Sequence, residues 1–272
     1  MKNVAWFSIL TWLAFLPSWA CSHEFWLSPS DFQARAGRAV SIGALAGNGF
    51  FEGEHKPWST EHAVCFLART SRVFDLKVAA GVGDYVWSRF LASDDGGAMV
   101  AFESSFTPIE LPGPKFNRYL EEEGLSGPRS ARQTLPSDLP GRERYRRCAK
   151  TWLGGTEVAR ALASFGLPLE IVPLGAPGAD SSLDIRVLRQ GRPLPGALVK
   201  AWCSPPDPEG LAVSGSTDGC AWEGRTDEAG RVRVPTRRAG AWLLSLVDMV
   251  PCADRTQADW ESTWASLTFA RP

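Results

Sequence analysis

The segment Leu183-Asp184-Ile185-Arg186-Val187-Leu188 alternates apolar and polar side chains at nearly every step. Successive side chains of a strand point to opposite faces of a sheet, so this period of two predicts a strand with one buried face. Gln190-Gly191-Arg192-Pro193 follows as a predicted turn, and residues 197–202 form the next predicted strand. A strand, a tight turn and another strand favour antiparallel β-structure.

The same pattern continues to the end of the chain, where Asp227-Glu228-Ala229-Gly230 and Arg238-Ala239-Gly240 are predicted turns. About seven strands separated by such turns are typical of an immunoglobulin-like or carboxypeptidase-regulatory-like sandwich. We therefore expect residues 165–272 to form a C-terminal β-sandwich domain. The other predicted strands of this half cover residues 169–172, 232–234, 241–247 and 260–269.

The first half is also rich in short predicted strands, and residues 23–112 are expected to form an N-terminal β domain. Residues 113–164 differ in character. Residues 115–124 have a helical composition that ends at Gly124, and residues 141–152 are strongly basic and predict either a helix or an extended connector. The predicted fold is therefore all-β, with two β-sandwich domains joined by a partly helical basic connector.

Composition limits the possible functions. The chain has 272 residues, a net charge of -1 and 22% charged residues, which suits a soluble globular protein. The charge is nearly balanced and no basic stripe is interleaved with aromatic residues, so nucleic-acid binding is not expected. Serine-hydrolase, zinc-protease and phosphate-loop motifs do not occur, and the acidic run Glu121-Glu122-Glu123 is predicted to be solvated, so we expect no enzymatic activity.

Residues 1–20 have the features of a secretory signal peptide. Lys2 provides a positive start, residues 4–16 are almost continuously apolar, and Pro17 ends the run. We therefore expect a periplasmic or secreted protein. No later apolar run is long enough to predict a transmembrane span.

Three processing outcomes remain open at the end of this segment. Cleavage after Ala20 leaves Cys21-Ser22-His23 at the start of the mature chain, and cleavage after Ser22 makes His23 its first residue. Lipidation of Cys21 is the least favoured outcome, because Ser18 stands where a bacterial lipobox usually has leucine.

Six cysteines in an exported chain favour disulfides over thiol catalysis. We predict a Cys203–Cys220 disulfide, because the residues between them are rich in Pro, Gly, Ser and Asp and a bridge would close this loop. In the chain-entropy model such a bridge contributes roughly 3 kcal/mol. Cys65, Cys148 and Cys252 are not assigned to pairs.

Four segments together resemble a family of exported bacterial proteins that is filed as a domain of unknown function. Members of this family are commonly labelled periplasmic components of nickel or cobalt uptake. The resemblance implies β-sandwich modules, export, a role in handling divalent transition metals and a membrane metal transporter as partner. The segments are residues 23–27 (HEFWL), 116–124 with 142–150, 191–199 with 226–234, and 259–269 (DWESTWASLTF).

The chain departs from the pattern of these relatives at two positions. They tend to keep one histidine at the mature start, a second in the segment that matches residues 47–53, and a third just before the methionine that matches Met249. Here the first is His23, but the other two positions are Asn48 and Asp248. A site of three imidazoles is therefore not expected, although Asp248 could supply an oxygen ligand.

His23 is the strongest candidate metal ligand. As the third residue of the mature chain it would complete a square-planar nitrogen site that suits copper(II) or nickel(II), and as the first residue its amine and imidazole would chelate the metal together. His55 is a second candidate, because the loop that carries it could fold back toward His23. In the alternative reading His23 starts an edge strand, His55 lies in a solvated acidic loop, and Asp248 forms a turn.

The predicted function is therefore an exported, non-enzymatic protein that binds or presents nickel, cobalt or copper through His23, His55 and Asp248. The alternative is a structural, adhesion or ligand-binding β-sandwich protein whose metal site is degenerate.

Overall fold

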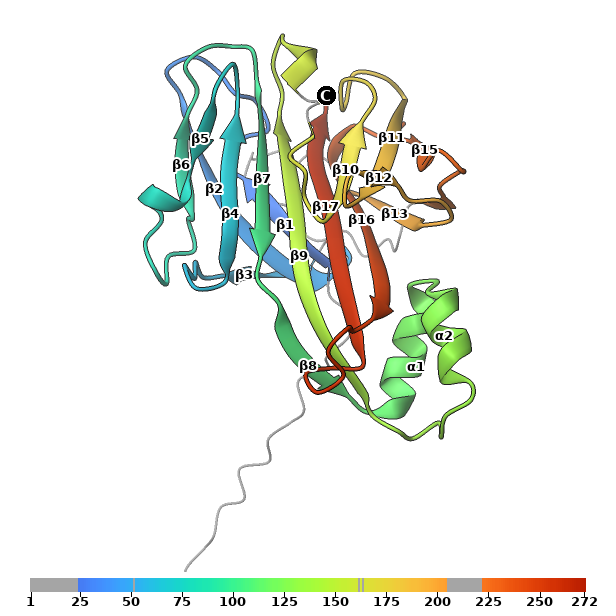
Figure 1. Ribbon diagram of the computed structural model, residues 1–272. Coiled ribbons are helices and arrows are strands. Elements are labelled where there is room, and N and C mark those ends of the chain that lie inside the picture. Colours follow the sequence, from blue (N-terminus) through green and yellow to red (C-terminus); the bar gives the residue numbers. More distant parts are fainter. Residues whose placement is uncertain (1–23, 51, 161, 163, 205–221) are drawn as a thin grey trace, which may run out of the picture.

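The computed structural model describes residues 24–50, 52–160, 162, 164–204 and 222–272 (Figure 1). Strands dominate this part of the chain, so the predicted all-β class is confirmed. The first strands are β1 (Glu24–Pro29), β2 (Ala39–Asn48), β3 (Glu52–Lys56), β4 (Ala63–Arg69), β5 (Val73–Asp75), β6 (Ser88–Leu91), β7 (Ala98–Ser104) and β8 (Thr107–Leu111). They are followed by β9 (Gly141–Leu153), β10 (Leu169–Pro173), β11 (Ser182–Arg189), β12 (Arg192–Pro193), β13 (Leu198–Ser204), β14 (Trp222–Arg225), β15 (Arg231–Pro235), β16 (Gly240–Pro251) and β17 (Trp260–Arg271).

A nine-stranded sheet forms the centre of the molecule. Its strand order is β14-β13-β16-β17-β9-β7-β4-β5, and β8 also pairs with β9. Only the β9–β17 pair is parallel among the ladders of the described residues. This sheet takes strands from all three predicted ranges (23–112, 113–164 and 165–272), so whether those ranges fold as separate domains stays a prediction.

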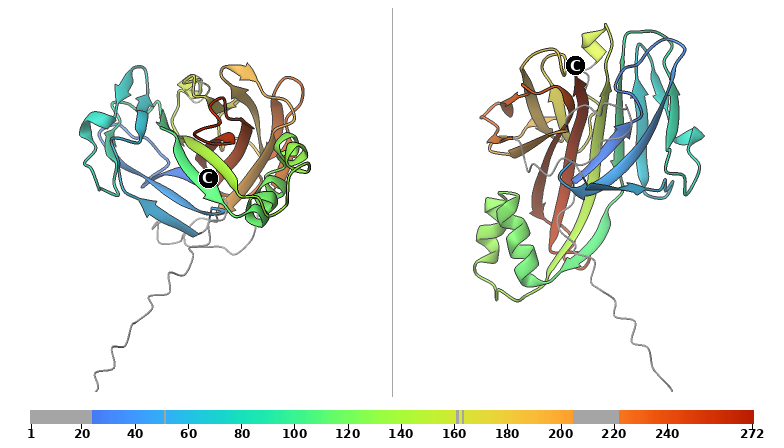
Figure 2. Two further views of the ribbon diagram at one scale, coloured as in Figure 1. Left: turned by 60° about the horizontal axis from the view of Figure 1, so that its bottom comes forward. Right: turned by 180° about the vertical axis from the view of Figure 1, so that it is seen from behind.

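Two four-stranded sheets cover opposite faces of the central sheet. Along β7, Ala101 faces the core beneath β10 and β11, while Val100 and Phe102 face the core beneath β1 and β2. This alternation along one strand gives the central sheet two buried faces. The result is a three-layer arrangement with a β-sandwich on each side, and Figure 2 shows the N-terminal and C-terminal sheets on either side of the central strands.

The basic segment is strand β9, so of the two predicted conformations the extended one is present. Because β9 and β17 run parallel, its arginines meet acidic side chains at the start of β17: Arg142 lies 2.9 Å from Asp259, which directly precedes this strand, and Arg144 lies 2.6 Å from Glu261. The guanidinium of Arg144 also lies 4.6 Å from the centre of the Phe106 ring. These contacts let a strand with such a high charge occupy the centre of the sheet.

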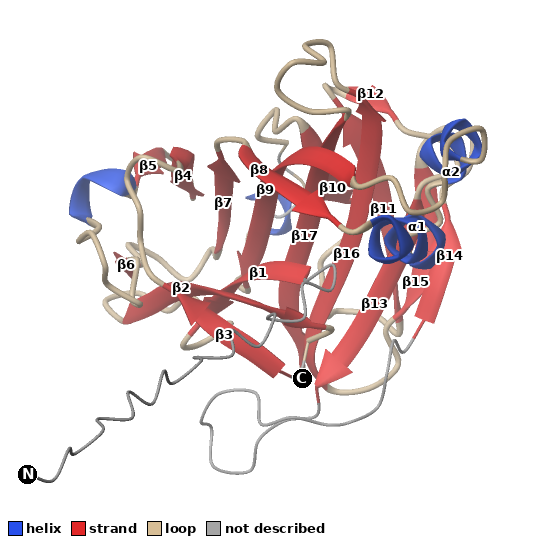
Figure 3. Ribbon diagram, turned by 90° about the horizontal axis from the view of Figure 1, so that it is seen from below, coloured by secondary structure: helices blue, strands red, loops and turns tan. Residues whose placement is uncertain are grey.

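The helices are α1 (Gly113–Glu122) and α2 (Ser126–Arg132), with short 3-10 turns η1 (Lys77–Ala79) and η2 (Val158–Arg160). The predicted helix is α1, and it ends before Gly124, whose φ of 62° is the left-handed conformation common after helices. Phe116 and Leu120 of α1 pack against Val247 and Trp264 of the central sheet. Figure 3 shows α1 and α2 beside each other. In the part of the chain covered by the structure, neither helix has the length and apolar character needed to cross a membrane.

Candidate functional site

The start of β1 lies in the interior of the protein. β1 packs across β9 and β17, and the Leu27 carbonyl accepts a hydrogen bond of 2.8 Å from the Thr268 hydroxyl. Leu27 enters the N-terminal core, whereas Trp26 packs against Phe50 and Trp202. The first described side chain, Glu24, is only 4% exposed. A carboxyl group buried this deeply needs partners, because desolvation destabilises its charged form.

Five ionisable side chains gather around this point, and we call them the β1 cluster. Lys200 of β13 lies 2.9 Å from the Glu123 carboxylate at the end of α1. The Gly49 backbone N–H donates a 3.0 Å hydrogen bond to Glu24. The members of the β1 cluster are Glu24, Glu123, Glu143, Arg147 and Lys200.

Burial dominates the electrostatics of this cluster. It raises the pKa of the Glu24 carboxyl, while the Gly49 N–H and the positive charges of Lys200 and Arg147 act in the opposite direction. Burial also raises the pKa of Glu123; Lys200 opposes this shift, and the negative charge of Glu24 adds to it. The two carboxyl groups therefore repel each other, and Lys200 relieves that repulsion.

The other half of the cluster is built on β9. Glu143 is 3% exposed and accepts hydrogen bonds from the Ser262 hydroxyl and, at 3.3 Å, from the Tyr119 hydroxyl. The Arg147 guanidinium lies 4.7 Å from the centre of the Trp264 ring. Its Nη1 atom is buried and has no hydrogen-bond partner among the described residues. Within that part of the chain the cluster therefore has one N–H donor left for an acceptor.

Sequence reasoning missed this cluster. The acidic run at 121–123 was predicted to be solvated, but Glu123 is only 7% exposed because the end of α1 packs on β13, so that prediction is wrong for Glu123. A signal for Glu24 was present: it shares a strand face with Trp26, which is a side chain that is normally buried.

The predicted metal ligands are not all in the described part of the chain. His23 lies outside the described residues. His55 is on β3, paired with Leu45 of β2, where its ring is exposed and 6.3 Å from the Tyr85 ring. Among the residues that the structure describes, no three His, Cys, Asp or Glu side chains are grouped closely enough to hold a metal ion.

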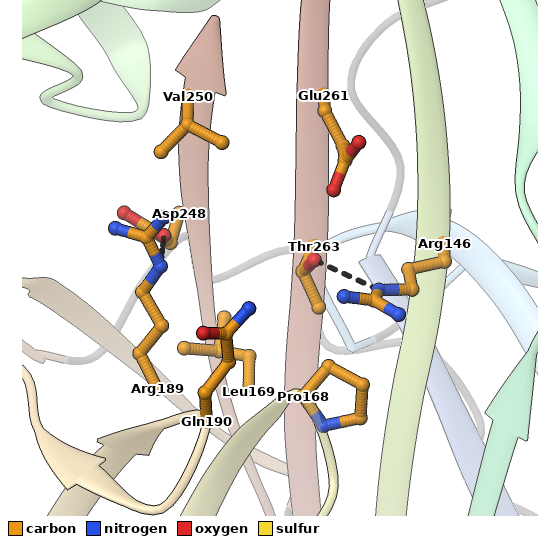
Figure 4. Close-up of a pocket in the computed structure, with 9 residues that line it drawn as sticks. All are labelled: Arg146, Pro168, Leu169, Arg189, Gln190, Asp248, Val250, Glu261 and Thr263. Carbon is orange, nitrogen blue, oxygen red and sulfur yellow. Dashed lines mark hydrogen bonds and ion pairs between the residues drawn. The ribbon is translucent and has the colours of Figure 1, made fainter. Parts of the chain in front are cut away.

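Asp248 lies on the other face of the central sheet from β1. Along β16, Leu246 and Asp248 face the C-terminal layer, whereas Val247 faces α1. The Asp248 carboxylate pairs with Arg189 of β11 at 3.1 Å, and Figure 4 shows the two side chains pointing toward each other beside Gln190. The cavity there measures about 20 Å³, which suits a single water molecule and no larger ligand. Burial raises the pKa of the Asp248 carboxyl above its ordinary value, and the positive charge of Arg189 opposes that shift.

The described cysteines have free thiols. The Cys203 thiol is buried and lies 3.7 Å from the Ala239 carbonyl, while Cys220 lies outside the described residues, so the Cys203–Cys220 disulfide stays a prediction. Cys65 and Cys148 both pair across the sheet with Glu103, one on each side of β7. Two strand spacings of about 4.8 Å separate them, which is too far for a disulfide.

Comparison with known proteins shows to which family this sequence belongs. Residues 20–248 match the model of a domain of unknown function, DUF4198. The chain belongs to this family. The description of the DUF4198 family states no function. A search of curated proteins finds no match. Among solved structures, the D0-D1 domain of intimin is similar at 10% identity and a TM-score of 0.20, covering 91% of this chain and 97% of that one.

Proposed function

We propose that this DUF4198 protein is exported and binds a divalent transition metal (nickel, cobalt or copper) through His23, without catalysing a reaction. A membrane metal transporter is the proposed partner. The observation that carries this proposal is the burial of Glu24 in the β1 cluster. Glu24 follows His23 directly in the sequence and is 4% exposed.

The described residues do not fit the full predicted ligand set. Asp248 is in an ion pair with Arg189 on the opposite face of the sheet from β1, and His55 is exposed on β3 beside Tyr85. The proposed site therefore depends on His23 and on the amine and amides of the segment before it. Nitrogen ligands of this kind suit copper(II) and nickel(II).

Metal titration of the exported protein tests the proposal. Intact mass first identifies the N-terminal residue, and the metal-free protein is then titrated with copper(II), nickel(II) and cobalt(II) by calorimetry and visible absorption. We expect one saturable site, weakened at least about tenfold by His23→Ala, because loss of a ligand or its support has this scale of effect. His62→Ala, which removes an exposed imidazole elsewhere in the chain, is the matched control and should leave the affinity unchanged. Binding that never saturates, or an equal loss in both variants, would refute the proposal.

His55→Ala separates the remaining possibilities. Since His55 is exposed and outside the β1 cluster, we expect its substitution to leave the metal affinity unchanged. A tenfold loss would instead bring β3 into the site.

The Asp248–Arg189 ion pair favours one alternative: a structural or ligand-binding β-sandwich protein in which the metal site is degenerate. Under this alternative no metal would bind saturably to the wild-type protein. The same titration therefore decides between the two functions.

A further inference from the structure

The helical hairpin formed by α1 and α2 has a surface groove, and no member of the β1 cluster belongs to its lining. Two adjoining cavities of about 460 and 490 Å³ lie along it, and they share Leu120 and Glu121 of α1, Arg129 of α2, and Gln133. Because these four residues belong to the lining of both cavities, we treat the two cavities as one groove and call it the helix groove. Ser137 belongs to the lining of the first cavity, and Arg225 of β14 belongs to the lining of the second.

Four arginines line the helix groove, and among the described residues only Arg129 forms an ion pair. Arg129 lies 3.1 Å from Glu121, and both side chains are more than half exposed. Arg118 is exposed and makes no hydrogen bond or ion pair with the described residues. Glu121 is the one acidic residue of the lining, so the described groove has an excess of positive charge.

The other two arginines are held in place by uncharged groups. Arg132 donates to the side-chain oxygen of Asn117 at 2.6 Å and to the Leu139 carbonyl. Arg225 donates to the Gly196 carbonyl at 2.6 Å and to the Gly124 carbonyl at 3.3 Å. Carbonyl oxygens orient a guanidinium without neutralising it. Arg132 is only 6% exposed and its guanidinium lies 5.0 Å from the centre of the Phe116 ring, whereas Arg225 is exposed. Arg118 and Arg225 therefore present the positive charges that a ligand can reach.

The rest of the lining suits a peptide. Pro114, Leu120 and Leu135 are apolar, and Leu135 is 45% exposed. Gln133 and Ser126 supply hydrogen-bonding groups. Apolar and polar groups beside uncompensated arginines match a segment that carries carboxylates as well as apolar side chains.

We propose that the helix groove binds an acidic peptide segment of a partner protein. The concave shape favours a peptide over a lipid surface, because a planar array of headgroups meets the rim of a groove and does not enter it. Arginine clusters recognise acidic motifs through charge-assisted hydrogen bonds, and such binding weakens as salt screens the charges. This proposal is independent of metal binding at His23.

The test uses the metal-free exported protein and a fluorescein-labelled hexaglutamate peptide, followed by fluorescence anisotropy. We expect saturable binding at low salt that weakens as salt rises from about 50 to about 300 mM. Hexalysine, with the same label, should not bind. Arg118→Glu should weaken hexaglutamate binding at least about fivefold, because it replaces an attractive charge with a repulsive one.

Arg89→Glu is the matched control, since Arg89 is an exposed arginine of β6 and the substitution changes the net charge equally. It should alter the affinity by less than about twofold. Gln133→Glu provides a second variant inside the groove and should weaken binding in the same direction as Arg118→Glu. Equal losses in Arg118→Glu and Arg89→Glu, or binding to phosphatidylglycerol vesicles without binding to hexaglutamate, would overturn the proposal.

Discussion

Replacing Lys200 by methionine tests the electrostatics of the β1 cluster most directly. Lys200 is 14% exposed, its partner Glu123 is 7% exposed, and their charged atoms are 2.9 Å apart. Methionine keeps most of the side-chain volume but removes the cation, so Glu123 remains buried beside Glu24. Removing one partner of a buried ion pair costs about 3 to 5 kcal/mol. We expect a loss of about 3 kcal/mol at pH 8, since Lys200 retains some contact with solvent.

The pH dependence of this loss has a definite sign. Burial already raises the pKa of Glu123 above its ordinary value of 4.5, and Lys200 opposes that shift. A carboxyl group whose pKa is raised in the folded state stabilises folding at low pH, and this contribution is lost as the pH rises through the folded-state pKa. Without Lys200 the folded-state pKa rises further. The difference between wild type and Lys200→Met should therefore be larger at pH 8 than at pH 5.

Urea unfolding, followed by tryptophan fluorescence at both pH values, measures the effect. The double variant Lys200→Met with Glu123→Gln is the control, because it removes both charges and should recover most of the lost stability. A loss below about 1 kcal/mol at pH 8 would place the pair among weak surface salt bridges and refute this reasoning. Equal losses at pH 5 and pH 8 would refute it too.

Three further predictions concern the surroundings of the cluster and the thiols. Gly49 has a φ of 69°, and a Cβ there would lie 3.1 Å from the Trp202 indole nitrogen. In urea unfolding, Gly49→Ala should lower the free energy of unfolding by about 1 to 2 kcal/mol. Gly37→Ala should lower it less, because φ is 73° there but the space around the added Cβ is open. Equal losses would show that the contact with Trp202 is unimportant. Tyr119→Phe removes a donor from the buried Glu143 carboxylate and should cost about 1 to 2 kcal/mol in the same assay, and an unchanged stability would mean that Ser262 alone satisfies Glu143. Burial raises the pKa of Cys65 to about 11 and that of Cys148 to about 12. Alkylation of both thiols at pH 8, followed by mass spectrometry, should therefore be slow in the native protein and fast in urea. Rapid alkylation of Cys148 in the native protein would contradict its buried position.

Local patterns predicted the regular elements well. The alternation at residues 183–188 lies within β11, where Leu183, Ile185 and Val187 are buried, and residues 260–269 lie within β17. Both predictions rest on periodicity, which adjacent residues determine.

The conformation of the basic segment and the role of Asp248 depended on residues distant in the sequence. The arginines of β9 pair with Glu261 of β17 and with Asp259 directly before it, a pairing that no local pattern encodes. Asp248 stays a predicted metal ligand, and the sequence gives no sign of its ion pair with Arg189, which depends on the packing of β11 on the central sheet. Glu123 was misread for a similar reason, since its burial results from the packing of α1.

The position of β17 also bears on the order of folding. This last strand lies between β16 and β9, so the central sheet remains in two parts until residues 260–271 are available. Its contact with β9 closes a chain segment of more than a hundred residues, as in the pairing of Arg144 with Glu261. Contacts this distant in sequence slow folding. For a chain that we propose is exported, this delay keeps the polypeptide unfolded, and so able to be threaded through a membrane pore, until residues 260–271 pair with β9 and β16.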